Sequence, residues 1–568
     1  MSIYSPSVMF PIETLVDFYD DLLFAKCALT PADIDSLFSF WASQGIQSVT
    51  WYYQADDRGG LIHRRCPVPG APGHDAFEIY RNCNVMQEAA RCAHAHGIRF
   101  IAGYKPYETG FYGMDVATAR QQDIRTVMQA GRMITGIDPF VVEHPELRLK
   151  LKPSLRAASP NPRIGKIELW KADDAPTRIK AENLEFLFSD ENCRYQVQEI
   201  PFGFHQEIRM APADGFDLYG NQIFQAGRPV RVLCLTGMDF QSPDWALRCR
   251  NLEGEGDFTG LGTRMMRVFD VEGRQLNGCF AGKRTICDAG ANDLETHGAY
   301  FDIGWGRFSQ TFDAPGEYIA FLAEKPEYVT GALCETSPEV QEFWLRNVRA
   351  MLDAGADGIE FRIENHSCMT DDAAAYGFNE VVLAACGENA SDDAVAKVRG
   401  DAYTHFLHKA SEMIHKAGKI TRLNLSVDGL AKRVPEDRLL AFPQNVEYQW
   451  ERWLAEGYAD EAVLRVYNAA NRKNALKLAL TDRIAEQCRR HQVPLYFSHH
   501  VFPHFQEQGK MSGDSWCVEE AKRIAADRRF AGLSLYENSI FVRCNAGHCW
   551  EWLPKAEELL QEMVRLQG

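Results

Sequence analysis

The sequence predicts an α/β protein: a (β/α)8 barrel, of the TIM type, with an all-β sandwich domain inserted after the third strand. Helix-like segments with one apolar face alternate with short strands towards both ends of the chain. Between about residues 160 and 325 this alternation gives way to short strands separated by Gly, Pro, Asp and Asn. We therefore expect one barrel assembled from residues 1–154 and 326–568, with the sandwich at 155–325.

Seven helix-then-strand units are visible. In the first, the helix-like run PADIDSLFSFWASQG ends at Gly45 and is followed by the strand-like SVTWYYQ. In the third, Ser337 is the expected N-cap and Pro338 stands in the first helical turn. An eighth strand is expected at SVMFPIE, near the N-terminus, which gives the number that a barrel of this type requires. The other strands are expected at IRFIAGY, IEFRI, KITRLNLSV, EAVLRVY, VPLYFSHH and FAGLSLYEN.

Composition narrows the kind of partner and the compartment. A chain of 568 residues predicts about two to four domains, and no stretch approaches the roughly 20 apolar residues of a membrane span. The net charge of -17 disfavours nucleic acid and anionic membranes as partners, because both need clustered Lys and Arg. Sixteen scattered cysteines and an acidic N-terminal segment without a signal-peptide pattern favour the cytoplasm. The oligomeric state stays open.

Several short motifs resemble those of sugar-processing barrels. DAGADGIEFRIENHS resembles the fourth strand, "GxDGxxxD", of many barrel glycoside hydrolases, and QWERWLAEGYADEAVLRVYN resembles the stretch before the sixth strand of the hypothetical glycosyl hydrolase-like (family-10-like) group. QGIQSVTWYYQ and HGIRFIAGYKPYE are similar to the second and third strands of that group, and VVEHPEL to its histidine-proline segment. The resemblance covers the barrel alone and implies an enzyme acting on carbohydrate. The chain departs from the pattern at Arg362, where the family has an acidic residue.

The fourth predicted strand carries the main candidate residues. Because strand side chains alternate between faces, Glu360, Arg362 and Glu364 share one face, and the apolar residues between them should face the helices. Glycosidic cleavage needs one carboxylic acid and a second carboxylate, held on a rigid frame. We expect Glu364 and Glu537 to form that pair, with Glu360 or Asp428 as the substitute. The residues expected to bind substrate at the same rim are Arg362, Asn365, His366, Trp51, Tyr104, Lys105, Tyr107, Asn424, Asp428, His499, His500 and Asn538.

Two alternatives stay open beside glycoside hydrolysis. His499, His500 and His504 could hold a divalent cation together with Glu360 or Glu537, as in a metal-dependent barrel lyase or isomerase acting on a sugar. The departure at Arg362 is also compatible with a non-catalytic barrel that binds glycans. The segment CNAGHC, with Cys544, His548 and Cys549, is a weaker candidate for structural zinc. The expectation is an enzyme without metal or cofactor, for which sugar, linkage and stereochemistry are left open.

Overall fold

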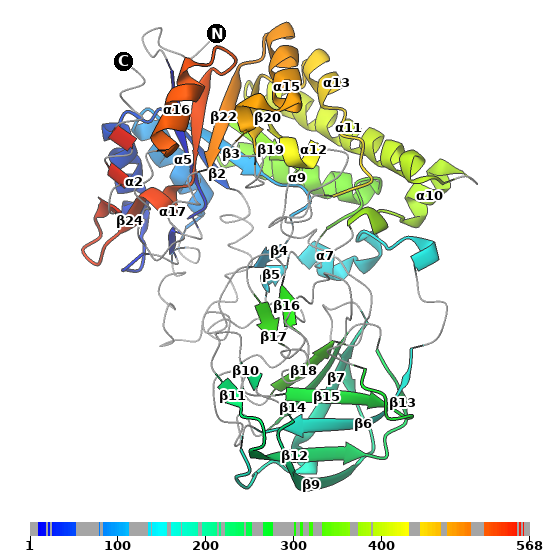
Figure 1. Ribbon diagram of the computed structural model, residues 1–568. Helices are drawn as coiled ribbons and strands as arrows, with labels where there is room; N and C mark the ends of the chain where they lie inside the picture. Colours follow the sequence, from blue (N-terminus) through cyan, green and yellow to red (C-terminus); the bar gives the residue numbers. More distant parts are fainter. Residues whose placement is uncertain are drawn as a thin grey trace.

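Eight parallel strands close into a barrel in the computed structural model of the protein (Figure 1). Each strand pairs in parallel with the next, and the last strand pairs with the first. This confirms the predicted fold class, including a barrel assembled from both ends of the chain. In order around the barrel the strands are β1 (Ile12–Val16), β2 (Ser48–Tyr52), β3 (Arg99–Tyr104), β19 (Gly358–Arg362), β20 (Ile420–Ser426), β21 (Glu461–Arg465), β22 (Leu495–His500) and β23 (Gly532–Tyr536).

The structure describes the chain in segments. These are residues 10–18, 21–22, 25–52, 79, 83–108, 110–112, 134–137, 139–155, 161–171, 173–190, 196–212, 215–216, 222–243, 246–252, 265–276, 300–302, 307–309, 317–321, 332–363, 373–387, 390–430, 443–466, 474–500, 516–553, 556–557 and 560–561.

The first strand begins later than the sequence predicted. The prediction covered residues 7–13, whereas β1 covers Ile12–Val16. The register explains the difference, because Ile12 pairs with Leu533 of β23 and Val16 pairs with Trp51 of β2. Pairing with β2 on one side and β23 on the other therefore fixes the position of β1. The apolar residues of the segment alone did not show this position.

Helices precede the barrel strands in sequence, as the unit pattern predicted. Helix α2 begins with a capping box between Thr30 and Asp33, and the Ser391 side chain accepts a hydrogen bond from the Ala394 N–H at the start of α11. Ser337 is the N-cap residue of α9 but makes no side-chain capping bond. The helices are α2 (Pro31–Ser43), α5 (Val85–Ala95), α7 (Pro139–Glu143), α9 (Pro338–Asp353), α10 (Glu380–Cys386), α11 (Asp392–Lys416), α12 (Val427–Leu430), α13 (Trp450–Ala455), α15 (Ala479–Arg490), α16 (Trp516–Ala526) and α17 (Asn538–Phe541). In the part of the chain that is described, no helix has the length and apolar character to cross a bilayer.

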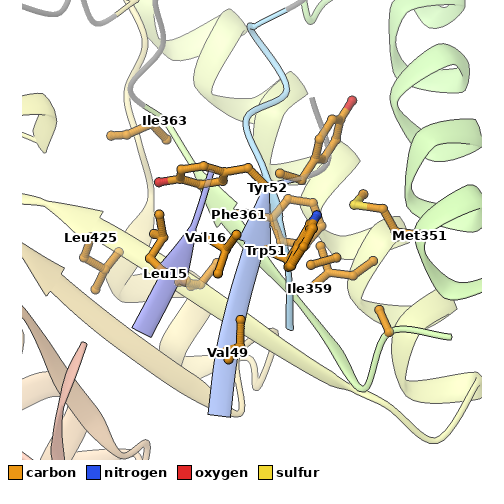
Figure 2. Close-up of a cluster of buried hydrophobic side chains, with 14 of the residues drawn as sticks. Leu15, Val16, Val49, Trp51, Tyr52, Met351, Ile359, Phe361, Ile363 and Leu425 are labelled. Atoms are coloured by element: carbon orange, nitrogen blue, oxygen red, sulfur yellow. The ribbon is translucent and has the colours of Figure 1, made fainter. Parts of the chain in front are cut away.

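The main core lies between the barrel wall and these helices. Trp51 of β2 is fully buried there and stacks on Phe18 and Phe38, with ring centroids 5.1 and 5.8 Å apart. Ile359 and Phe361 of β19 are buried in the same cluster (Figure 2). Burying a side chain of this size contributes about 1.5–3 kcal/mol. Since the apolar residues of β19 face the helices, its alternate residues face the barrel interior.

Two antiparallel sheets follow β3 and precede β19 in the sequence. Side chains from both sheets form a second hydrophobic cluster that includes Leu169, Phe186, Leu233 and Leu247. Figure 1 shows these sheets at a distance from the barrel, beyond the β4 (Gly110–Tyr112) and β5 (Ile134–Ile137) pair. One sheet contains β13 (Phe240–Gln241), β6 (Arg163–Trp170), β12 (Pro229–Thr236) and β9 (Gly203–Met210), with β15 (Met265–Asp270) also on β6; the other contains β18 (Glu317–Phe321), β14 (Ala246–Asn251), β7 (Leu184–Ser189) and β8 (Gln196–Gln198).

Smaller two-stranded sheets complete the described strands. They are β10 (Gly215–Phe216) with β11 (Gln222–Phe224), β16 (Tyr300–Asp302) with β17 (Arg307–Ser309), and β24 (Val542–Cys544) with β25 (Trp550–Trp552).

The chain leaves the barrel for these sheets and returns to it at one place. The Leu149 N–H donates to the Ala332 carbonyl at 3.0 Å, and the Cys334 N–H donates to the Leu147 carbonyl at 2.8 Å. The outgoing and returning segments therefore lie side by side, which is what an insertion into a barrel loop requires.

Candidate active site in the barrel

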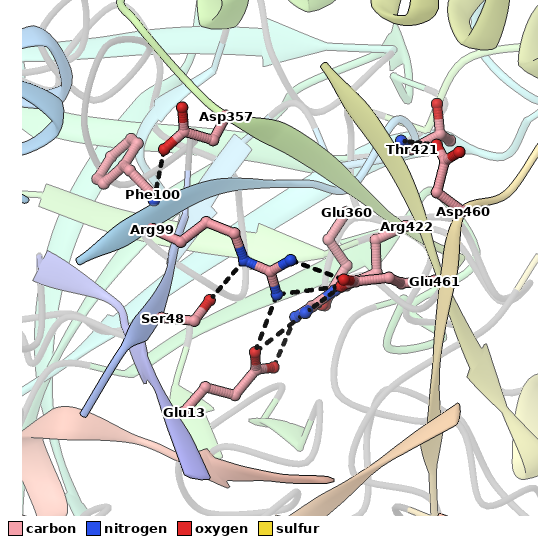
Figure 3. Close-up of polar contacts among 10 residues, drawn as sticks. All are labelled: Glu13, Ser48, Arg99, Phe100, Asp357, Glu360, Thr421, Arg422, Asp460 and Glu461. Atoms are coloured by element: carbon pink, nitrogen blue, oxygen red, sulfur yellow. Dashed lines mark hydrogen bonds and ion pairs between the residues drawn. The ribbon is translucent and has the colours of Figure 1, made fainter. Parts of the chain in front are cut away.

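A buried ion network fills the barrel interior near the N-terminal ends of its strands (Figure 3). Arg422 of β20 donates to Glu13 of β1 at 2.6 and 3.0 Å, and to Glu461 of β21 at 2.6 and 3.0 Å. Arg99 of β3 donates to both oxygens of Glu461, at 2.6 and 3.1 Å. Two guanidinium groups thus balance two carboxylates, which makes the burial of Glu13, Arg422 and Glu461 tolerable.

This network changes the acidity of its members. Burial raises the pKa of Glu461, but the charges of Arg422 and Arg99 outweigh it and lower that pKa to about 2. Burial opposes the charged form of Arg422, and the carboxylates of Glu13 and Glu461 overcome it and raise the Arg422 pKa further. Glu461 and Arg422 therefore stay ionised near neutral pH, and their pair acts as a fixed structural element below the candidate site.

Two further carboxylates each precede one barrel strand and accept a hydrogen bond from the start of the strand next to it. Asp357 accepts a hydrogen bond from the Phe100 N–H at 3.0 Å, and Asp460 accepts one from the Thr421 N–H at 2.8 Å (Figure 3). Burial raises the pKa of Asp357, and the Phe100 N–H and Lys419 lower it by more. Both residues lie at the N-terminal end of the barrel, where polar groups generally serve stability.

Glu360 lies inside the barrel, as its alternation with Ile359 and Phe361 predicted. It accepts a hydrogen bond from Asn424 Nδ2 at 2.9 Å. Its carboxylate also lies 3.3 Å from Arg362 Nε and 3.7 Å from Arg422 Nη1. Glu360 therefore links the N-terminal ion network to the groups nearer the C-terminal ends of the strands.

Cations and tyrosine rings alternate near the C-terminal ends of five barrel strands. We call this set, Lys105, Tyr52, Arg362, Tyr536 and Arg465, the rim layer. Tyr52 has the Lys105 ammonium and the Arg362 guanidinium each 4.9 Å from its ring centroid. Tyr536 has Arg362 at 5.9 Å and Arg465 at 4.5 Å. Each cation is thus oriented by a rigid ring, an attraction of about 2 kcal/mol when both groups are desolvated.

Gly103 of β3 makes room for this arrangement. A Cβ built at Gly103 would lie 2.6 Å from Cδ1 and 2.9 Å from Cε1 of Tyr52. Any side chain at this position would push the Tyr52 ring out of its place between Lys105 and Arg362.

Carboxylates also follow the ends of the barrel strands. Glu537 comes directly after β23, is 4% exposed, and has Ser539 Oγ 3.4 Å from its Oε1. Asp428 lies in α12, directly after β20, and is buried. Glu108 follows β3 and pairs with Lys105 at 3.0 Å. Barrel enzymes place their reactive groups at this end of the strands, so these three carboxylates are the described candidates for acid–base chemistry.

Four of the residues expected to bind substrate lie in the packed core instead. Tyr104 Oη accepts a hydrogen bond from Asn347 of α9 at 2.9 Å, and Tyr107 stacks on Tyr403 of α11 with centroids 5.7 Å apart. Trp51 lies on the helix side of β2 (Figure 2). Asn538 accepts from Trp41 Nε1 at 2.8 Å and donates to Asp21 at 2.6 Å. Packing against the helices accounts for these side chains, which are not members of the rim layer.

Several expected site residues fall outside the described part of the chain. These are Glu364, Asn365 and His366, and also the side chains of His499 and His500, whose backbone ends β22.

The segment CNAGHC forms contacts rather than a clear set of metal ligands. Cys544 Sγ lies 3.7 Å from Cys27 Sγ, and His548 Nδ1 lies 3.0 Å from Asp33 Oδ2. Cys549 is exposed and donates to the Gly547 carbonyl at 3.5 Å. Within the described residues, one group brings donor atoms of His, Glu and Cys within 4.8 Å of one another, and it lies in the sheet that contains β9 and β12.

Comparison with known proteins gives structural likeness only. No family model and no curated protein matches this chain, so the family-10-like resemblance stays a prediction. The solved structures include an α-galactosidase from Lactobacillus brevis (TM-score 0.34, 8% identity, 98% of this chain and 40% of that one). They also include a GH20 exo-β-N-acetylglucosaminidase from Vibrio harveyi (TM-score 0.33, 9% identity, 99% of this chain and 59% of that one). A third is an isomaltulose synthase from Protaminobacter rubrum (TM-score 0.34, 9% identity, 94% of this chain and 65% of that one).

This chain therefore spans between 40% and 65% of the length of those three proteins. At these TM-scores the likeness carries no argument about the site, and the barrel is established by its own strand order and register.

Proposed function

We propose that the barrel is a carbohydrate-acting enzyme that cleaves a glycosidic bond by acid–base chemistry between carboxylates. The observation that carries the proposal is the position of Glu537, a buried carboxylate directly after β23 and next to the rim layer member Tyr536. A buried carboxyl group on a rigid strand end is the kind of group that can protonate a leaving oxygen.

The second carboxylate in this proposal is Glu364, with Glu360 or Asp428 as substitutes. Glu360 is the less suitable of the two substitutes, because Asn424, Arg362 and Arg422 already surround its oxygens. Asp428 follows β20 at the same end of the barrel as Glu537. In either case one carboxyl group donates its proton to the glycosidic oxygen, and the other attacks the sugar or activates a water molecule.

The rim layer supplies groups that suit a sugar. Lys105, Arg362 and Arg465 are donors for ring hydroxyls, and the rings of Tyr52 and Tyr536 hold these cations in position. Asn424, Asn365, His366, His499 and His500 remain proposed substrate contacts. We further propose that residues 155–325 form an accessory sandwich domain, which the hydrophobic cluster shared by the two sheets supports.

The test is a panel of aryl glycosides offered to the purified full-length chain, with and without a chelator. The proposal expects release of the aryl group at a rate that the chelator leaves unchanged. Activity abolished by the chelator and restored by a metal would replace it with the metal-dependent alternative. Sugar-dependent thermal stabilisation without turnover would indicate a glycan-binding barrel.

A further inference from the structure

Three side chains of types that can bind a metal lie on one face of the antiparallel sheet that contains β9 and β12, away from the barrel. His205 and Glu207 belong to β9, two residues apart, so they share a face. Cys234 of β12 is the cross-strand partner of His205. Leu233 and Leu235, the neighbours of Cys234, point into the hydrophobic cluster between the two sheets. The three side chains therefore lie on the outer face.

The donor atoms are already close together. One ligand atom from each of His205, Glu207 and Cys234 lies within 4.8 Å of the other two. Cys234 Sγ is 3.2 Å from Glu207 Oε1. Donors held about 2.0–2.3 Å from a tetrahedral Zn²⁺ lie roughly 3.3–3.8 Å from one another. Small side-chain rotations on two hydrogen-bonded strands are enough to close that gap.

The surroundings allow Glu207 to exchange its present partner, Arg209, for a metal ion. Arg209 now pairs with Glu207, and its Nη2 lies 3.5 Å from Cys234 Sγ. The same guanidinium also donates through Nη1 to Glu168 at 2.9 Å. Glu168 is 2% exposed and is held further by Lys166 and Trp170. Arg209 thus keeps a buried carboxylate partner when Glu207 turns to a metal.

The surroundings of Glu207 and Cys234 set the charges of these two groups. Arg209 lowers the pKa of Glu207, so its carboxylate is ionised near neutral pH. Burial, together with the nearby Glu207, raises the pKa of Cys234 to about 12. Cys234 is therefore a thiol in the absence of metal, and a bound metal displaces that proton.

We propose that His205, Glu207 and Cys234 form a binding site for a divalent transition metal of the zinc class. One imidazole nitrogen, one carboxylate oxygen and one thiolate sulfur would occupy three positions, and water the fourth. On binding, the S–H bond of Cys234 breaks, a metal–sulfur bond forms, and the proton passes to solvent. The site is independent of the proposed activity of the barrel.

The test is titration of the reduced full-length chain with Co²⁺, followed by displacement with Zn²⁺. The proposal expects one equivalent of Co²⁺ to give thiolate-to-metal absorption, which Zn²⁺ abolishes. Cys234→Ser should remove the absorption, and Glu207→Gln should weaken Zn²⁺ binding by at least about tenfold, or 1.4 kcal/mol.

The matched control is Cys544→Ser, because Cys544 Sγ lies 3.7 Å from Cys27 Sγ and is a second place where thiolate could bind Co²⁺. This variant should keep the absorption of the unmodified chain. Absorption that survives in Cys234→Ser but disappears in Cys544→Ser would overturn the proposal. So would the absence of Co²⁺ and Zn²⁺ binding at micromolar metal in the unmodified chain. The unfolding temperature of metal-free Cys234→Ser shows whether a lost signal reflects lost folding.

Discussion

Arg422 and Glu13 meet across the barrel interior through two hydrogen bonds of 2.6 and 3.0 Å, although 409 residues separate them in the sequence. They belong to the fifth and first strands in the barrel order, which lie on opposite sides of it. The contact therefore joins the two parts of the chain that the inserted sheets separate.

Replacing Arg422 with Met should lower the free energy of unfolding by about 3–5 kcal/mol, because it leaves Glu13 and Glu461 buried without their shared partner. Urea unfolding followed by fluorescence measures the change. Arg483→Met is the control, since Arg483 makes a two-bond pair with Glu451 on the surface and should lose less than about 1 kcal/mol. Equal losses in the two variants would contradict a stabilising role for the interior network.

The acid stability of the barrel should depend on Glu461. Its pKa is about 2 in the folded chain and near 4.5 in the unfolded one, so its contribution is fully present above about pH 4.5 and disappears as the pH falls towards 2. This difference between the folded and unfolded pKa of Glu461 corresponds to about 3 kcal/mol of unfolding free energy. Unfolding free energies from pH 7 to pH 2.5 should therefore fall less steeply in Glu461→Gln than in the unmodified chain. Parallel curves would rule out this source of acid sensitivity.

Tyr104 and Tyr107 should prove structural. Tyr104→Phe should cost about 1–2 kcal/mol of stability, because the buried amide of Asn347 loses its acceptor. Tyr107→Phe should change stability little, because the stacking with Tyr403 is kept. Both variants should keep the KM of the unmodified enzyme for any substrate found in the glycoside panel. A several-fold rise in KM with unchanged stability would indicate that the replaced tyrosine contacts the substrate.

Arg362 should matter for turnover, as the central cation of the rim layer. Arg362→Met removes the charge beside Glu360 and between Tyr52 and Tyr536, and should lower kcat/KM by about 10- to 100-fold, or 1.4–2.8 kcal/mol. Arg362→Lys should recover part of the loss, because an ammonium keeps the charge but not the planar stacking. Arg452→Met, at an exposed ion pair on α13, is the control and should leave kcat/KM unchanged. An Arg362→Met variant as active as the control would remove the rim layer from the mechanism.

The sequence predicted the barrel well because its signals are local. Helices such as α9 show their apolar face and N-cap position within one segment, and Ile359 and Phe361 reveal the facing of β19 by simple alternation. The same alternation would have identified the interior residues of two other strands. Arg422, Asn424 and Ser426 share one face of β20, and Glu461 and Arg465 share one face of β21.

The site was harder to predict, because it depends on contacts between distant segments. Tyr104 and Tyr107 stand at a strand end like true rim residues, and only the packing of α9 and α11 shows that they belong to the core. Arg99, Glu13 and Glu461 form one network only once the barrel closes. Arg465 and Tyr536 likewise become neighbours through tertiary structure.

The most direct test of the proposed chemistry is the single-turnover rate of Glu537→Gln on an aryl glycoside that the unmodified enzyme cleaves. The glutamine keeps the size of the side chain but cannot exchange a proton, so binding should be retained and the rate should fall by at least about a thousandfold, or 4 kcal/mol. Glu364→Gln, Glu360→Gln and Asp428→Asn, measured beside it, would show which second carboxylate acts. A rate in Glu537→Gln equal to that of the unmodified enzyme, in a variant of unchanged unfolding temperature, would contradict the account.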